Sequence, residues 1–276
     1  MGYWLPDNRL EMPELFHPRR KPVGEVEIDW KHKSNLQDKL TGFFLFDRIE
    51  GGIRNVTGGR GLTRQYYGGG GQDLEPSILV DPEHGRVARM KDRVYGSSKE
   101  LTDEDLFTDD WEFTTAVLYK LHTYESNGGA PVAMGDSSSG GTTQWVIKDY
   151  SNEVNFYMST STGDVVCDDS NNAAPLNEWV FRLATSNRVT GETVLHTKGM
   201  PAISSGFTRI GSPFNFAAST APNGGFRFGI GDANAGTGVR SFDGELALGA
   251  VWNKFFTKEM AEAFFANPYQ FLRPKL

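Results

Sequence analysis

The strongest constraint on the fold is a two-residue alternation of apolar and polar side chains that recurs in short segments along most of the chain. Successive side chains of a β-strand point to opposite faces, so each such segment predicts a strand with one apolar face. Turn sequences rich in Gly, Asn and Ser separate the segments. This spacing predicts an all-β, antiparallel jelly-roll sandwich. The clearest segments are 111–121, 143–149, 153–158, 178–185, 225–231 and 242–252.

Two of these segments predict which side chains face the core. In 178–185 (EWVFRLAT) the alternation places Trp179, Phe181 and Leu183 on one face. Near the C-terminus, the same spacing aligns four large apolar side chains on one face of a single strand. They are Phe242, Leu246, Leu248 and Trp252.

A short helix is predicted directly after this last strand, over 257–267. Thr257 is an N-cap residue type, and Met260 and Phe264 are four residues apart, on the same side of a helix. Asn267-Pro268 ends the pattern. We expect the helix to lie across an open face or edge of the sandwich, where it shields backbone groups from pairing with other chains.

The first 35 residues differ from the rest. Pro6, Pro13, Pro18 and Pro22 follow at short intervals, and proline favours extended backbone at its own position and at the preceding one. Residues 1–35 are therefore predicted to form an extended arm, and residues 36–276 the sandwich. We expect the arm to pack on its own domain or to dock on a neighbour through its apolar side chains. These are Trp4, Leu5, Leu10, Leu15 and Phe16.

The C-terminal motif resembles a known family. A strand reading D-G-x-aliphatic-A-x-x-A-aliphatic-W-N, then a capped helix and Asn-Pro, is similar to the end of concanavalin A-like (laminin-G-type) jelly rolls of phage structural proteins. The residues that carry it are Asp243, Gly244, Trp252, Asn253, Thr257, Glu259, Asn267 and Pro268. The central pair of strands also resembles the family, but its usual Tyr-x-Asp-Gly turn reads His196-Thr197-Lys198-Gly199 here. The resemblance implies a virion protein, and a fold hosts many functions.

Composition narrows the classes of function. The net charge of −7 and the absence of a basic stripe disfavour nucleic-acid binding, which depends on neutralising phosphates. The sequence contains no run of 18 apolar residues, so no membrane-spanning helix is predicted. One cysteine, Cys167, excludes an intrachain disulfide, and no secretory signal is recognisable. We expect synthesis in the host cytoplasm and a location in the virion.

Possible sites are few. Asp164, Asp168 and Asp169, with Asp232 as a further ligand, supply the hard oxygens that Ca²⁺ prefers on a turn, although solvated turn acids are the simpler interpretation. Tyr66 and Tyr67 are candidates for stacking on a sugar. Glycosidases of this fold carry acids at alternate strand positions, but only Glu27 and Asp29 match here and the third acid is missing.

The sequence therefore favours a non-enzymatic bacteriophage virion protein, either a capsid decoration subunit or a tail-associated one. Its arm would dock on other virion proteins, and we expect a homo-oligomer, with a trimer as the first guess. The alternative is a carbohydrate-binding module for receptor binding or adhesion. A glycan hydrolase is disfavoured because no catalytic set is complete.

Overall fold

The computed structural model describes most of the chain after residue 19. The described residues are 20–22, 24–48, 52–59, 61–66, 77–90, 94–98, 112–124, 129–135, 143–160, 163–169, 172–187, 190–206, 226–228, 230–234 and 238–275. The arm residues proposed for docking, Trp4, Leu5, Leu10, Leu15 and Phe16, lie outside them.

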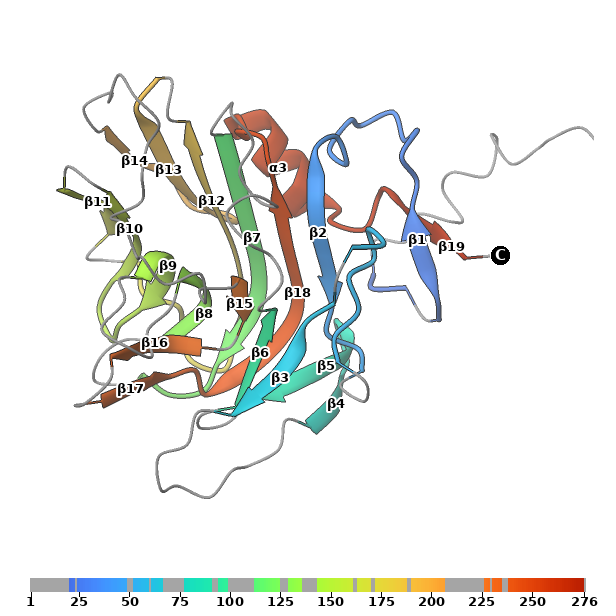
Figure 1. Cartoon of the computed structure of the whole chain (residues 1–276), viewed down its shortest axis with the longest axis horizontal. Coiled ribbons are helices and arrows are strands. Elements are labelled where there is room, and N and C mark those ends of the chain that lie inside the picture. Colours follow the sequence, from blue (N-terminus) through green and yellow to red (C-terminus); the bar gives the residue numbers. More distant parts are fainter. Residues whose placement is uncertain are drawn as a thin grey trace, which may run out of the picture.

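Two antiparallel sheets face each other, which confirms the predicted all-β sandwich (Figure 1). One has seven strands, in the order β11 (Gly163–Asp169), β10 (Val154–Thr160), β9 (Thr143–Asp149), β8 (Gly129–Gly135), β15 (Phe226–Phe228), β6 (Val94–Ser98) and β3 (Thr63–Tyr66). The other has eight: β14 (Ile203–Gly206), β13 (Glu192–Thr197), β12 (Trp179–Asn187), β7 (Glu112–Leu121), β18 (Gly244–Trp252), β5 (Gly85–Met90) and β4 (Ser77–Asp81), with β2 (Leu40–Leu45) also paired to β18.

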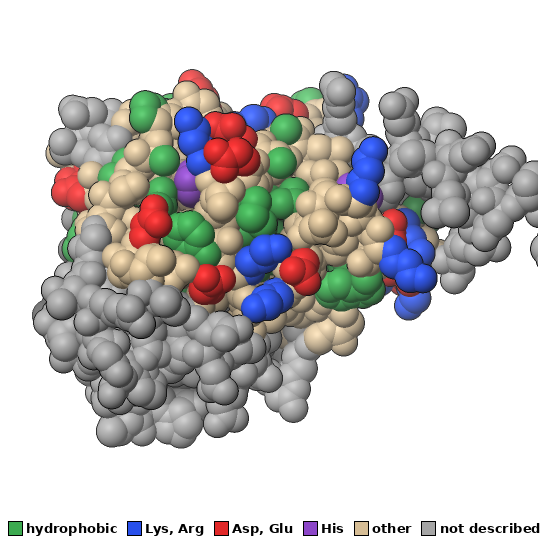
Figure 2. Space-filling view, turned by 90° about the horizontal axis from the view of Figure 1, so that it is seen from above, with side chains coloured by type: hydrophobic (Ala, Val, Ile, Leu, Met, Phe, Trp, Pro, Cys, Tyr) green, Lys and Arg blue, Asp and Glu red, His purple; other side chains and the backbone are tan. Residues whose placement is uncertain are grey.

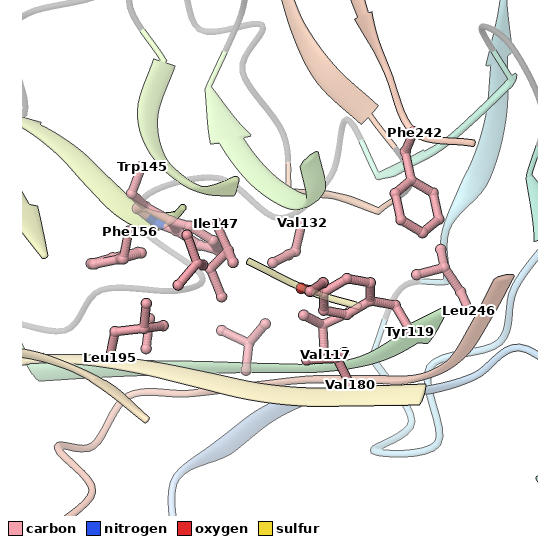
Figure 3. Close-up of a cluster of buried hydrophobic side chains, with 14 of the residues drawn as sticks. Val117, Tyr119, Val132, Trp145, Ile147, Phe156, Val180, Leu195, Phe242 and Leu246 are labelled. Carbon is pink, nitrogen blue, oxygen red and sulfur yellow. The ribbon is translucent and has the colours of Figure 1, made fainter. Parts of the chain in front are cut away.

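The core between the sheets is built from the alternating residues that the sequence predicts. Val117 and Tyr119 of β7 project into the space between the sheets, which Trp145 and Phe156 of the opposite sheet enter from the other side, as Figure 3 shows. The rings of Phe113 and Trp145 stack with their centroids 5.5 Å apart. Two-residue alternation therefore identified the face between the sheets correctly in β7, β9 and β10.

A third layer covers the outer face of the eight-stranded sheet. It contains helix α3 (Lys258–Ala266) and a ribbon formed by β1 (Val26–Ile28) and β19 (Leu272–Pro274), visible on the outer side of β2 and β18 in Figure 1. The Thr257 side chain accepts a hydrogen bond from the Met260 amide, so the predicted N-cap is confirmed. No helix of the described residues is long and apolar enough to span a membrane.

The third layer gives the eight-stranded sheet two buried faces. Phe181 and Leu183 of β12 pack under α3, where the Phe181 and Phe265 ring centroids are 4.8 Å apart. The side chains that the sequence aligned on one face of β12 therefore face the helix, while Val180 and Ala184 line the core between the sheets. Period 2 identifies the two faces of a strand but cannot say which layer each face meets.

One predicted alignment is wrong. Phe242 and Leu246 lie between the sheets, but Leu248 and Trp252 face α3. The register of β18 against β7 shifts between Leu246 and Leu248, which marks a β-bulge. A bulge adds one residue to a strand and so exchanges the faces of every side chain after it.

A second predicted strand is divided. Residues 225–231 contribute to β15 and to β16 (Ile230–Asn234), and these belong to different sheets because β16 pairs only with β17 (Gly238–Ser241) among the described strands. The sequence places Gly229 between them, and glycine weakens a strand interior.

The described part of the predicted arm does not stand alone. Glu27 of β1 pairs with Arg273 of β19, and both Val26 and Ile28 are buried in the layer beneath α3. Lys21 is also buried, and its Nζ donates a hydrogen bond of 2.6 Å to the carbonyl oxygen of Arg86. Burial lowers the pKa of Lys21 to about 7.

Candidate functional site

An exposed tryptophan marks the turn that follows β1. Trp30 has 53% of its surface exposed, and it lies in the segment 29–37, called the Trp30 turn below. Lys31 and Lys33 beside it are exposed as well. Large aromatic side chains are usually buried because of the apolar area they carry, so this exposed indole is the first candidate for a contact residue.

The backbone of the Trp30 turn is held by buried groups. The Gln37 amide nitrogen donates to the carbonyl oxygens of Trp30, at 3.2 Å, and of His32, at 2.8 Å. Gln37 is itself buried, with 3% of its surface exposed. The Asp29 carboxylate accepts from the Lys31 amide at 3.2 Å. The turn therefore presents the indole on a fixed backbone.

The turn is also fastened to the core. The Asp29 amide donates to the Phe271 carbonyl oxygen at 2.7 Å, and the Trp252 indole N–H donates to the Leu36 carbonyl oxygen at 2.7 Å. Leu36 and Trp252 are both buried. Because these anchors belong to strand β18 and to the segment just before β19, the position of Trp30 depends on long-range contacts as well as on the hydrogen bonds within the turn.

Two exposed lysines, Lys31 and Lys33, follow Trp30 in the same turn. Among the described residues, neither the Lys31 nor the Lys33 ammonium group forms an ion pair. Elsewhere the surface mixes both signs: in Figure 2, positive and negative side chains alternate with apolar ones over the visible face. A turn that exposes an indole and two lysines is chemically suited to a ligand with an aliphatic face and oxygen acceptors.

A second cluster of polar side chains lies on the outer face of the eight-stranded sheet. The Lys120 ammonium group lies 3.0 Å from Asp81 Oδ2 and 3.2 Å from Glu245 Oε2. It also lies 4.7 Å from the centre of the Trp179 ring, and the Trp179 indole N–H donates to Asp81 Oδ2 at 3.0 Å. Glu245 further contacts His122 Nε2 at 2.9 Å.

This cluster is internally satisfied. Asp81 Oδ1 accepts hydrogen bonds from the backbone amides of Glu83 and His84, each at 2.9 Å. Burial alone would raise the pKa of Asp81, but the hydrogen bonds from His84, Lys120, Trp179 and Glu83 outweigh it and hold the pKa well below its usual range. A carboxylate held ionised in this way is a poor proton donor.

A third polar group is completely buried between the sheets. The Arg182 guanidinium donates to Asp149 Oδ1 and to the Tyr119 hydroxyl oxygen, both at 2.6 Å, and the Tyr119 hydroxyl donates to Asp149. The Ala174 amide donates to Asp149 at 3.1 Å. Arg182 and Asp149 have no exposed surface, and burial raises the pKa of Tyr119 well above its ordinary value. Without solvent access, this group has a structural role.

The four acids predicted to bind calcium lie on two different strands and do not form one loop. Gly163–Asp169 forms the edge strand β11 and not a turn, so Asp164 and Asp168 lie four residues, or about 13 Å, apart along it. Asp232 belongs to β16, which packs beside β8 and β6, whereas β11 is an edge strand of the seven-stranded sheet, separated from β8 by β10 and β9. Within the described part of the chain, no three metal-ligating side chains gather.

The remaining sequence candidates have the following positions. Tyr66 ends the edge strand β3, and Tyr67 lies outside the described residues. Glu27 binds Arg273 Nε at 2.7 Å, and Asp29 caps the Trp30 turn, so both acids of the incomplete glycosidase pattern have structural partners. Sequence reasoning passed over Trp30, although an aromatic residue within the charged run DWKHK was an available signal.

Comparison with solved structures supports the fold. The binding domain of botulinum neurotoxin DC in complex with SialylT aligns with 83% of this chain at 14% identity and a TM-score of 0.54. A structure of botulinum neurotoxin type C, whose cell entry depends on two ganglioside molecules according to its description, aligns with 84% at 16% identity and a TM-score of 0.56. Trypanosoma rangeli sialidase, in complex with a difluoro-KDN ligand, aligns with 83% at 10% identity and a TM-score of 0.56.

These likenesses extend over part of each neighbour. The chain spans about half the length of the two neurotoxin structures and a third of the sialidase. At such identities the alignment shows a shared β-sandwich and does not locate a ligand site. No protein-family model and no curated protein sequence matches the chain. None of the three structures is a phage protein, so the phage resemblance stays a hypothesis.

Proposed function

We propose that this chain is a non-enzymatic carbohydrate-binding module and that the Trp30 turn is its glycan-binding site. The observation that carries the proposal is the exposed Trp30 indole on a backbone anchored to the core. A rigid aromatic ring offers a large contact area at small cost in conformational entropy, which is why tryptophan dominates many binding sites.

The chemistry of the turn favours acidic glycans. The indole face can stack on the C–H face of a sugar ring, and the Lys31 and Lys33 ammonium groups can donate to hydroxyl or carboxylate oxygens. The sialyl and ganglioside ligands named for two neighbours support a glycan as the ligand class. Support for a non-enzymatic role comes from the carboxylates of Asp81 and Glu245, which are both engaged by Lys120.

The test is binding of the full-length chain to a glycan array, followed by titration of the best ligands. We expect Trp30→Ala to weaken binding at least about tenfold, the usual minimum for an aromatic anchor. Met200→Ala is the matched control, because Met200 is also an exposed apolar residue, with 39% of its surface exposed, but lies outside the turn. Equal binding by Trp30→Ala and the original chain would refute the site.

Charge selection is tested separately. Replacing both Lys31 and Lys33 with glutamine should weaken acidic glycans more than neutral ones, and added salt should do the same. If the affinities for acidic and neutral glycans fall equally, the two lysines do not select for the negative charge of the ligand. Repeating the titration with EDTA tests the calcium hypothesis for Asp164, Asp168, Asp169 and Asp232, because loss of binding on chelation is expected only if the ion supports the site.

The virion role is the second candidate, supported by the strand–helix motif at the C-terminus, whose Thr257 cap is formed. A capsid decoration or tail-associated subunit should cosediment with phage particles stripped of it. Removing residues 1–19 should abolish that binding if the arm docks the protein. If the chain binds glycans but no phage particles, the virion role is excluded and the carbohydrate-binding module remains.

A further inference from the structure

Strand β4 forms one end of the eight-stranded sheet and has an open edge. Among the described strands, only β5 pairs with it, in a regular antiparallel register from Ser77 opposite Arg89 to Asp81 opposite Gly85. In an antiparallel strand, alternate residues direct their N–H and C=O groups away from the paired neighbour. The outer edge of β4 therefore presents donors and acceptors that another strand can satisfy.

Each face of β4 exposes one apolar side chain. Val80 has 80% of its surface exposed and Leu79 has 40%, and adjacent residues of a strand point to opposite faces. Ile78 is partly exposed. Pairing with a further strand would remove these exposed apolar side chains from water.

The other sheet ends carry features that discourage pairing. Strand β11 holds Asp164, Asp168 and Asp169, whose like charges would repel a second copy. Strand β3 contains Arg64, and β14 is four residues long with two serines. By contrast β4, with the sequence SILVD, has no Lys, Arg, Pro or Gly and no bulge, and its one acid is already bound to Lys120. Proteins normally protect open sheet edges with charged residues, proline or β-bulges.

We propose that two copies of this chain associate by antiparallel pairing of their β4 strands about a twofold axis at Leu79. In that register Leu79 lies beside Leu79 of the other copy, Ile78 beside Val80, and Ser77 beside Asp81. The strand is self-complementary because apolar residues meet apolar ones and the single carboxylate meets a hydroxyl group. The two eight-stranded sheets then form one continuous sheet.

The geometry sets the size and strength of the assembly. Each copy has one β4 edge, and twofold pairing uses both edges, so no third copy can join through this contact. Five paired residues bury less than the roughly 1,200 Å² of a stable interface, so the dimer should dissociate at about micromolar concentration. The proposal does not depend on the Trp30 turn, and Trp30→Ala should dimerise like the original chain.

The first test is sedimentation over a range of protein concentrations. We expect a monomer–dimer equilibrium that Val80→Lys weakens at least about tenfold, since it removes an apolar contact and adds like charges at the interface. Val166→Lys is the matched control, because Val166 is an exposed valine on β11, an edge strand of the seven-stranded sheet. Both residues are exposed, so neither variant should lose its fold, and circular dichroism checks this.

The second test fixes the register. Leu79→Cys should form an intermolecular disulfide on mild oxidation, whereas Val166→Cys should not. Background is low because the one natural cysteine, Cys167, is buried. A monomer at all concentrations, a trimer, or a dimer weakened by Val166→Lys and not by Val80→Lys would overturn the proposal.

Discussion

Replacing Asp149 alone should destabilise the protein strongly. The carboxylate accepts hydrogen bonds from Arg182, Tyr119 and the Ala174 amide, in a region without exposed surface. Asp149→Leu would leave the Arg182 guanidinium buried between the sheets with no compensating charge. Solvation of that charge by water is lost on folding, and nothing of opposite sign replaces it.

The expected magnitude follows from this geometry. Breaking a fully buried ion pair by removing one partner costs about 3–5 kcal/mol. For a domain of this size, that corresponds to a fall in melting temperature of about 10 °C. Tyr119→Phe removes a neutral hydrogen-bonding group and no charge, so we expect it to cost only about 1–2 kcal/mol.

The double variant makes the reasoning refutable. Asp149→Leu combined with Arg182→Met removes both charges, so its free energy of unfolding should lie above that of Asp149→Leu. Urea unfolding followed by tryptophan fluorescence and circular dichroism measures all variants on one scale. If the double variant is as unstable as the sum of the single ones, or if Asp149→Leu loses less than about 1 kcal/mol, the buried charge does not govern stability as argued.

Three further predictions concern single residues. Thr257→Ala should lower the free energy of unfolding by about 1 kcal/mol in urea titrations, because the Met260 amide loses its cap, whereas Thr257→Ser should not. Gly244→Ala should markedly lower the melting temperature, since its Cβ would collide with the carbonyl oxygen of Lys120, and an unchanged melting temperature would contradict that crowding. Burial lowers the pKa of His196, against an opposing effect of Glu262, and Lys258 adds to the lowering. The imidazole is therefore neutral when folded, and its contribution is present above the unfolded pKa of about 6.5 and lost as pH falls toward the folded value. His196→Leu should flatten the decline of the urea midpoint between pH 7.5 and 5, and an unaltered decline would exclude this residue as its source.

The sequence by itself determined the fold class, the positions of β7, β9, β10, β12 and β18, and the C-terminal helix. Alternation in β7, β9 and β10 and the Thr257 cap are local signals, because each depends on residues within a few positions of one another. Such signals do not depend on the partner against which a segment packs. They therefore survive when the rest of the structure is unknown.

Only the tertiary structure decided which layer each face meets and where the candidate site lies. The bulge in β18 moves Leu248 and Trp252 to the helix side, and the alternation gives no sign of it because register is a property of two strands. Likewise Trp30 is presented by Gln37, Leu36 and the Trp252 indole, whose hydrogen bond spans 216 positions of the chain. Exposure is what remains after all the other segments have packed, so the charged run around Trp30 can suggest that the indole is exposed, but only the packed structure decides it.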